Sequence, residues 1–164
     1  MEREAEIEIR SARSSDRSAI LAMVPELVAF GPPAWRDADQ MTRTDLAVIE
    51  EALSWCGEEN VVSVFVATLN ADVVGFVHVR AAADYYLRTQ QAHVADLVVS
   101  PRARGRGIAT KLLRRAEDWA RESGFKQLTI AVFEANREAL TLYERRGFER
   151  ETIRLVKPLP ATDS

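Results

Sequence analysis

The sequence of 164 residues contains a single cysteine, Cys56, so no intramolecular disulfide and no Cys-x-x-Cys metal site can form. It also lacks any apolar run close to the roughly 20 residues that a membrane-spanning helix needs. The first residues, Met-Glu-Arg-Glu-Ala-Glu-Ile-Glu, are charged where a secretory signal peptide would be apolar. We therefore expect a soluble, cytoplasmic protein that binds neither a membrane nor a metal.

An excess of positive charge is missing as well. The chain has 22 Lys and Arg residues against 25 Asp and Glu residues, which gives a net charge of −3. This balance provides no overall electrostatic attraction for nucleic acid, so we expect no nucleic-acid partner. With 47% hydrophobic and 29% charged residues, the chain can form one domain with a buried core. We expect this single domain to span residues 1–164, with its core in about 6–156.

The spacing of apolar residues predicts an α/β fold. Strands are expected where apolar residues alternate or β-branched residues cluster, and helices where apolar residues recur every three or four positions. The predicted strands are Ala5–Arg10, Val61–Leu69, Val73–Ala82, His93–Ser100, Gln127–Phe133 and Phe148–Val156. The predicted helices begin at Ser15 or Asp16 (with a kink or break at Pro25), at Thr44 or Asp45 after a loop over Trp35–Met41, at Gly107 and at Asn136. The order β-α-α-β-β-β-α-β-α-β predicts a mixed, mostly antiparallel sheet flanked by helices.

Residues 100–107, here called the glycine-arginine loop, place three arginines and two glycines directly before the strongest helix pattern. A helix N-terminus has unpaired N–H groups and favours negative charge, and Gly105 and Gly107 lack side chains that would keep a phosphate away. Neither common phosphate motif fits. A P-loop needs glycine before Lys111, and a dinucleotide fingerprint needs glycine at Thr110, which precedes that lysine. Phosphate binding of another kind, nucleic-acid contact and a solvated helix start remain as alternatives.

Residues Arg102-Ala-Arg-Gly-Arg-Gly107 match the R/Q-x-x-G-x-G/A motif of the GCN5-related N-acetyltransferase (GNAT) family. The preceding Asp96-Leu-Val-Val-Ser-Pro is similar to the strand that carries this motif in the family. The segment Asn136–Phe148, in which Tyr143 follows Asn136 by seven positions, resembles the second family hallmark. The predicted element order over Glu6–Val156 also agrees with the family fold. The chain is thus identified from its sequence as similar to GNAT enzymes.

The resemblance implies that acetyl-coenzyme A (acetyl-CoA) is the donor. Its pyrophosphate would bind backbone N–H groups of residues 104–110, and its pantetheine arm would pair with residues 97–99 like an added strand. The residues expected to bind the cofactor are Leu97, Val98, Val99, Arg102, Arg104, Gly105, Arg106, Gly107, Ile108, Ala109, Thr110, Asn136 and Tyr143. For any single arginine, the alternative is a solvated side chain at a helix start. Asn136 is also expected to cap its helix.

Acetyl transfer to an amine requires two proton movements. The amine, with a pKa near 10, must lose a proton before it attacks, and the departing thiolate must gain one. The resemblance assigns the second proton to Tyr143 and implies direct attack without an acyl-enzyme. The alternative for Tyr143 is a core aromatic that packs beside Ala139 and Leu140.

The base is less well defined by the sequence. Some family members carry glutamate immediately before the residue that matches Asp96, but this chain has Ala95 there. His93 is the candidate base, acting through a water molecule, and strict strand alternation predicts that Asp96 faces the other way. His78 and Glu134 are weaker candidates. The alternative for His93 is a structural residue at the start of a strand.

The acceptor is expected to be a small-molecule or peptide amine. In such folds the first two helices and the connection before the central strand determine it. In this chain those segments contain Trp35, Asp37, Asp39, Tyr85, Tyr86 and Arg88. A catalytically silent acetyl-CoA sensor of the same fold is the alternative function. Dimers are common in the family, so a homodimer is a further expectation.

Overall fold

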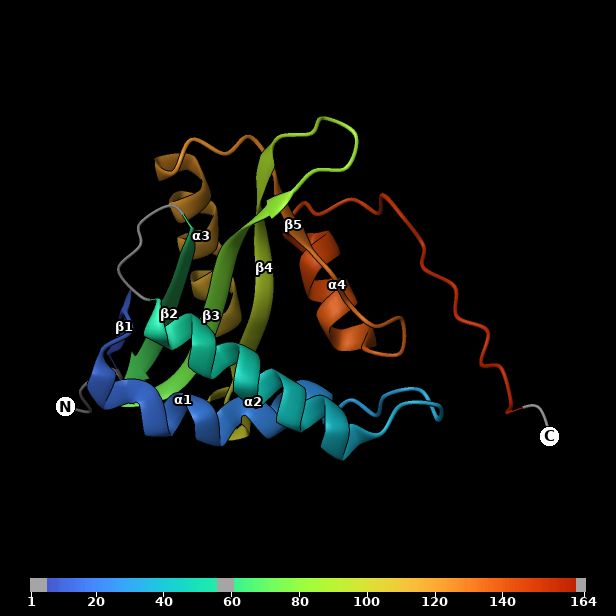
Figure 1. The fold of residues 1–164 in the computed structure, drawn as a ribbon. Helices are drawn as coiled ribbons and strands as arrows, with labels where there is room; N and C mark the ends of the chain where they lie inside the picture. The colour runs from blue at the N-terminus through green and yellow to red at the C-terminus, as the bar shows by residue number, and fades with distance from the viewer. Residues whose placement is uncertain (1–5, 56–60, 162–164) are drawn as a thin grey trace.

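The computed structural model of the protein describes residues 6–55 and 61–161, so Cys56 lies outside the described residues (Figure 1). The strands are β1 (Ile7–Ser11), β2 (Val62–Leu69), β3 (Asp72–Ala83), β4 (Gln90–Val99) and β5 (Leu128–Ile130). The α-helices are α1 (Arg17–Met23), α2 (Ala38–Ser54), α3 (Ile108–Glu122) and α4 (Arg137–Arg145). Short 3₁₀ helices are η1 (Ser14–Asp16), η2 (Val24–Val28) and η3 (Pro101–Ala103). Within the described ranges, no helix has the length and apolar character needed to cross a membrane.

The five strands form one sheet in the order β1-β2-β3-β4-β5. Only β4 and β5 are parallel, because the chain crosses over through α3 between them, and the other neighbours are antiparallel. The predicted mixed, mostly antiparallel sheet with flanking helices is confirmed.

The predicted final strand, Phe148–Val156, is wrong for this chain. Residues 149–161 form no strand or helix, and they run along no strand of the sheet. The predicted strand Gln127–Phe133 is also shortened, to β5 (Leu128–Ile130). An alternating pattern forms a strand only where a neighbouring edge accepts its main-chain hydrogen bonds. Among the described residues, no strand lies beside residues 148–156 and none lies on the outer side of β5.

The second helix begins earlier than predicted. It starts at Ala38, not at Thr44 or Asp45, because Oδ1 of Asp37 accepts hydrogen bonds from the N–H groups of Asp39 (2.9 Å) and Gln40 (3.3 Å). This cap converts the second half of the predicted loop into helix. The predicted break at Pro25 is confirmed, since α1 ends at Met23 and the chain continues as the 3₁₀ helix η2.

Two apolar layers cover the two faces of the sheet. We call the first the α3 core; it packs α3 and α4 on one face, and its buried members include Val77, Val94, Leu112 and Tyr143. We call the second the α2 core; it packs α1 and α2 on the opposite face, with Ile20, Ile49, Phe76 and Val98 among its buried members. Figure 1 shows α1 and α2 crossing one side of the sheet, with α3 on the other side. Any site between β4 and β5 is therefore open to groups from both layers.

Candidate active site

The candidate site begins where β4 and β5 separate. The two strands pair over only three positions, Ala92–Leu128, His93–Thr129 and Val94–Ile130, while β4 continues to Val99. Figure 1 shows that β4 and the segment that contains β5 diverge beyond this pairing. Residues 95–99 therefore have β3 on one side and no strand on the other among the described residues. An extended ligand with amide groups can pair with such an edge.

A β-bulge at Ala95 accompanies the separation. Val79 pairs with Val94 and His78 pairs with Asp96, so Ala95 is an extra residue opposite this step of β3. A bulge bends the strand and increases its local twist. This bend turns the second half of β4 away from β5.

The bulge also reverses which side chains of β4 face which layer. Val94 before the bulge and Leu97 after it both pack in the α3 core, although they are three residues apart. His93 and Asp96 consequently share the opposite face, on which Val98 joins the α2 core. The prediction that Asp96 faces away from His93 is wrong, because strict alternation fails where an extra residue is inserted.

The glycine-arginine loop forms a cradle of main-chain groups. Gly105 (φ +75°) and Gly107 (φ +72°) adopt the left-handed conformation, and Gly107 is the N-cap of α3. A Cβ atom added to either glycine would meet nothing within 4 Å, so the space in front of the loop is open. The first-turn N–H groups of Ile108, Ala109 and Thr110 have no acceptor within the helix. This arrangement fits a pyrophosphate.

The three arginines of this loop have exposed side chains. Arg102 lies 3.7 Å from Asp72, and Arg104 lies 3.2 Å from Glu26 and donates from Nε to the carbonyl oxygen of Val99 at 3.4 Å. Exposed ion pairs of this kind contribute little stability. The arginines can therefore reorient toward an anion at small cost.

Tyr143 is a buried member of the α3 core, against which Leu97 of β4 and Ile130 of β5 also pack. It lies on α4, whose predicted N-cap is confirmed: Oδ1 of Asn136 accepts a hydrogen bond from the N–H of Ala139 at 3.3 Å. The tyrosine ring is 8% exposed and packs edge-on against Phe148. Burial raises the pKa of Tyr143 to about 12. The hydroxyl therefore keeps its proton at physiological pH, as a proton donor must.

His93 is held in one orientation by β5. Its Nδ1 lies 2.8 Å from Oγ1 of Thr129, and this hydroxyl donates its proton to the carbonyl oxygen of Ala92 at 3.3 Å. In the tautomer that satisfies both contacts, Nδ1–H donates to Thr129 and a lone pair is left on Nε2. Burial, followed by the positive charge of Arg80, lowers the pKa of His93. The imidazole is therefore neutral near pH 7 and can accept a proton.

Two carboxylates lie on the same side of the sheet as His93. Asp96 accepts a hydrogen bond from Nδ1 of His78 at 2.8 Å, and the imidazole of His78 is only 2% exposed. His78 thus orients Asp96 and is too buried to meet a substrate amine. Asp45 on α2 stands one turn before buried Ile49, on the helix face that covers the sheet. Burial, with a contribution from the charge of Asp96, raises the pKa of Asp45 to about 6.

Sequence reasoning missed Thr129 and Asp45, which the structure places near His93 and Asp96 respectively. The sequence could have indicated Asp45, because it lies four and seven residues before Ile49 and Ala52 and therefore on the helix face that they bury. Thr129 had none, because only the register between β4 and β5 places it beside His93. Glu134, one of the weaker base candidates, forms an exposed 3.7 Å ion pair with Arg137.

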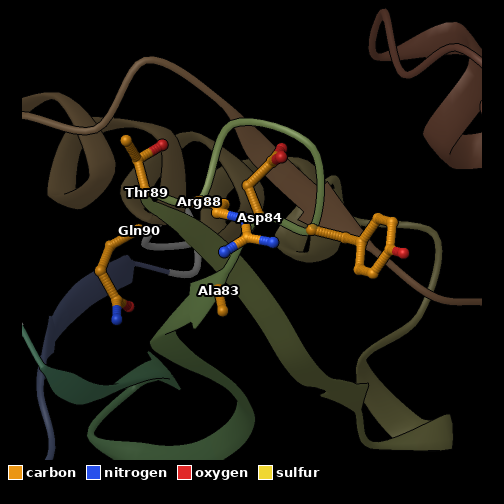
Figure 2. Close-up of a pocket in the computed structure, with 6 residues that line it drawn as sticks. Ala83, Asp84, Arg88, Thr89 and Gln90 are labelled. Carbon is orange, nitrogen blue, oxygen red and sulfur yellow. The ribbon is translucent and has the colours of Figure 1, made fainter.

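A shallow hollow lies at the opposite end of β4 (Figure 2). Its lining residues are Ala83, Asp84, Tyr85, Arg88, Thr89 and Gln90. Oδ1 of Asp84 accepts hydrogen bonds from the N–H groups of Tyr86 (2.8 Å) and Leu87 (2.7 Å), which shape the loop. The hollow lies where β4 begins, whereas the glycine-arginine loop follows its last residue. One of the residues in the segments predicted to determine the acceptor, Asp37, is the N-cap of α2.

The comparisons with known proteins agree with this geometry. A family model described as the acetyltransferase (GNAT) family matches residues 25–148. The chain belongs to the GNAT family. The N-acetyltransferase YhfO of Bacillus subtilis is 31% identical over 144 residues, which cover 88% of this chain and 91% of YhfO. The predicted family and enzyme class are confirmed: the protein is an acetyl-CoA-dependent N-acetyltransferase.

Solved structures agree on the GNAT fold. A Pyrococcus furiosus protein described as an acetyl transferase superposes with a TM-score of 0.75 and 26% identity, over 94% of this chain and all of the other. The aminoglycoside N-acetyltransferase AAC(6')-Iy, in a complex with CoA, gives a TM-score of 0.73 at 20% identity, over 98% of each chain. At that identity, the second comparison supports the fold alone.

Proposed function

We propose that this GNAT enzyme transfers the acetyl group of acetyl-CoA directly to a primary amine of a small, positively charged acceptor. One observation carries the proposal. The bulge at Ala95 opens β4 beside the glycine cradle and turns His93 and Asp96 to one face. A groove for the donor and a face for the acceptor therefore meet at the same point of one strand.

The donor would bind along the open side of β4. Leu97, Val98 and Val99 would pair with the pantetheine arm through their free main-chain groups. The cradle of Arg104, Gly105, Arg106, Gly107, Ile108, Ala109 and Thr110 would hold the pyrophosphate, with Arg102 and the other arginines near the phosphates and Asn136 near the arm. Acetyl-CoA supplies the acetyl group as an activated thioester.

His93 and Tyr143 would move the two protons. The Nε2 lone pair of His93 accepts the proton of the acceptor amine, through a water molecule, and the amine nitrogen then bonds to the acetyl carbon. The hydroxyl of Tyr143 donates its proton to the sulfur as the carbon–sulfur bond breaks. The buried position of Tyr143 and the contact between His93 Nδ1 and the hydroxyl of Thr129 support these roles.

The carboxylates favour a cationic acceptor. Asp45 and Asp96 lie on the same side of the sheet as His93. Asp96 is paired with His78, and no Lys or Arg side chain of the described residues forms an ion pair with either carboxylate. An acceptor with a second positive charge would offset the cost of burying these carboxylates. The proposed acceptor class is also the one named for a protein of the same fold, the aminoglycoside N-acetyltransferase AAC(6')-Iy.

An acceptor panel tests this proposal. The purified protein and acetyl-CoA are mixed with polyamines, aminoglycosides, neutral primary amines and peptides, and both thiol release and acetylated product are measured. We expect equal amounts of thiol and product with small polycationic amines, and little of either with neutral amines. Tight acetyl-CoA binding without thiol release from any amine would instead identify the catalytically silent sensor. Activity on peptides alone would refute the acceptor class.

A further inference from the structure

One buried histidine takes no part in the proposed proton transfers. His78 on β3 is only 2% exposed, and it lies in an apolar layer. Val64 faces it on β2, and Phe76 precedes it by two residues on the same side of β3; both belong to the α2 core. A polar ring in such a layer costs stability unless its nitrogen atoms are hydrogen-bonded.

Only one of the two ring nitrogens of His78 has a partner. Nδ1 lies 2.8 Å from Oδ2 of Asp96, which is the residue opposite His78 on β4. Nε2 is buried and has no hydrogen-bond partner among the described residues. Burial of an unpaired nitrogen is unfavourable, and an apolar side chain like those around it would avoid that cost. The contact with Asp96 is therefore the feature that a histidine supplies at this position.

The carboxylate of Asp96 has one oxygen engaged and one oxygen free. Oδ2 accepts the hydrogen bond from His78, whereas Oδ1 accepts none from the residues that the structure describes. The side chain is 12% exposed, so the carboxylate is nearly buried but can still be reached. A carboxylate oxygen forms its stronger hydrogen bonds with charged donors such as an ammonium group. Oδ1 is therefore available to a cationic acceptor.

The charge of Asp96 acts on the other ionisable groups of this face. Burial, followed by the charge of Asp96, raises the pKa of Asp45 on α2 to about 6. Burial and Arg80 on β3 lower the pKa of His93, and the charge of Asp96 opposes them. Asp96 therefore lies within electrostatic reach of both the proposed base and the second carboxylate.

We propose that His78 is a positioning residue for acceptor binding: it holds the Asp96 carboxylate in one orientation, so that Oδ1 binds the second positive charge of the acceptor while the reacting amine meets His93. The β-bulge at Ala95 makes this possible, because it turns Asp96 to the face of His93 and sets it opposite His78. The inference rests on the proposed function, since it needs an acceptor with two positive charges. It adds the residue that gives the enzyme its preference for such acceptors.

Straight-chain α,ω-diamines of three to six carbons test the proposal, each compared with the monoamine of the same length. The ratio of kcat/KM for the diamine to kcat/KM for the monoamine measures the preference for a second charge. We expect the parent to prefer at least one diamine. His78→Val should lose about tenfold of that preference, mainly through the KM of the diamine, which is the effect of one hydrogen bond to a charged group. Calorimetric titration of the diamine into the complex with CoA should show the same loss of affinity.

Two further variants separate the hydrogen bond from the packing of the core. His78→Gln is the rescue variant, because its amide N–H can donate to Asp96, and it should retain more of the preference than His78→Val. Phe76→Leu is the matched control, since it removes apolar volume from the same layer and leaves the polar pair in place. It should keep the full preference even if its Tm falls as far as that of His78→Val.

The pH dependence of the preference gives an independent measure. Loss of a hydrogen-bond donor favours the protonated form of a carboxylate, so the preference of His78→Val should recover in part as pH rises from about 6 to 9. Asp45, His93 and Arg80 are the same in parent and variant, so a difference between the two profiles reports on Asp96.

Two results would overturn the inference and leave the cationic acceptor of the proposed function standing. One is an equal diamine preference in parent and His78→Val, and the other is an equal loss of preference in Phe76→Leu. A parent that prefers no diamine would instead refute the cationic acceptor class, and this inference with it.

Discussion

His93 Nδ1 lies 2.8 Å from Oγ1 of Thr129, across the parallel pair that joins β4 to β5. In the tautomer that satisfies this contact and the 3.3 Å hydrogen bond from the threonine hydroxyl to the carbonyl oxygen of Ala92, the histidine donates from Nδ1 and offers Nε2 as an acceptor. The last paired positions of the two strands thus orient His93, the proposed base, at the point where they separate. This relationship makes the role of His93 testable through both partners.

His93→Ala should lower kcat/KM by about 10²–10⁴-fold, the usual contribution of a positioned base. In the parent enzyme, kcat/KM should rise with pH through the His93 pKa, which lies below the ordinary value of 6.5 because the ring is buried near Arg80. This low-pH limb should be absent from the variant. Thr129→Val should keep the rise of kcat/KM with pH, because His93 is still present. It should reduce kcat/KM by about tenfold, because the imidazole loses the hydrogen bond that orients it. An unchanged pH profile in His93→Ala would give this histidine a structural role only.

Tyr143→Phe should reduce kcat by roughly 10²–10⁴-fold, because it removes the proton donor and keeps the packing ring. Acetyl-CoA affinity should fall far less, by about 0.5–1.5 kcal/mol, the net contribution of one hydrogen bond. With its pKa near 12, Tyr143 should cause no loss of parent activity up to about pH 10. Steady-state rates and calorimetric binding give the two quantities. A variant with full turnover would contradict the assignment.

Gly107→Leu should abolish the increase in Tm that acetyl-CoA causes in the parent, since a side chain would occupy the cradle in front of α3. Gly124→Leu is the matched control. Gly124 ends the same helix at φ +80°, and an added Cβ there also meets nothing within 4 Å. Both variants should lose about 1–2 kcal/mol of stability from the left-handed conformation, but only Gly107→Leu should lose the ligand response. An undiminished response in Gly107→Leu would refute the cradle.

Asp45→Asn should stabilise the free protein at pH 7–8 and raise KM for a cationic acceptor. The pKa of Asp45 is raised to about 6 in the folded state, so the folded protein binds more protons than the unfolded chain between about pH 4 and 6. The free energy of unfolding therefore falls as pH rises from about 4 to 6, because Asp45 must then ionise in the folded protein. The loss of stability persists at higher pH. We expect a gain of about 1 kcal/mol, reduced by the partial exposure of the side chain.

Glu51→Gln is the control for Asp45→Asn, because it removes a charge from the exposed side of α2. It should change neither the free energy of unfolding nor the KM of the cationic acceptor. Urea unfolding at pH 4 and pH 8, together with acceptor kinetics, measures both effects. Equal KM values for parent and Asp45→Asn would exclude this carboxylate from acceptor binding.

Gly75→Ala should destabilise the protein by about 1–3 kcal/mol through overpacking. A Cβ atom at Gly75 would lie 2.8 Å from the carbonyl oxygen of Val98 and 3.3 Å from the side chain of Leu112. This glycine therefore lets β3 pack closely against β4 and the start of α3. Urea unfolding measures the loss, and a variant as stable as the parent would show that these neighbours shift freely.

Features that depend on neighbouring residues in the chain could be predicted from the sequence. Helix α3 ends at Glu122 and is followed by Gly124 with positive φ, and α4 is capped by Asn136 and followed by Gly147, as the local patterns indicate. The Asp37 cap could also have been predicted, since Asp37-Ala-Asp-Gln40 has the spacing of a capping box. The family motif identified the enzyme class for the same reason, because main-chain phosphate cradles are built from one short segment.

The catalytic face was decided by tertiary structure. Which way Asp96 points depends on a bulge that is visible only when β3 and β4 are aligned, and a one-residue offset moves a strand side chain to the other face. Thr129 meets His93 only through the pairing of strands whose contacting residues lie 36 positions apart. The segment Phe148–Val156 also depends on tertiary structure. Its alternating pattern is typical of a strand, but it forms one only if a sheet edge is available to pair with it. The sequence alone thus determined the fold class and the family, and it made the glycine-arginine loop and Tyr143 candidates for the donor site, whereas strand register determined which side chains share a face with His93.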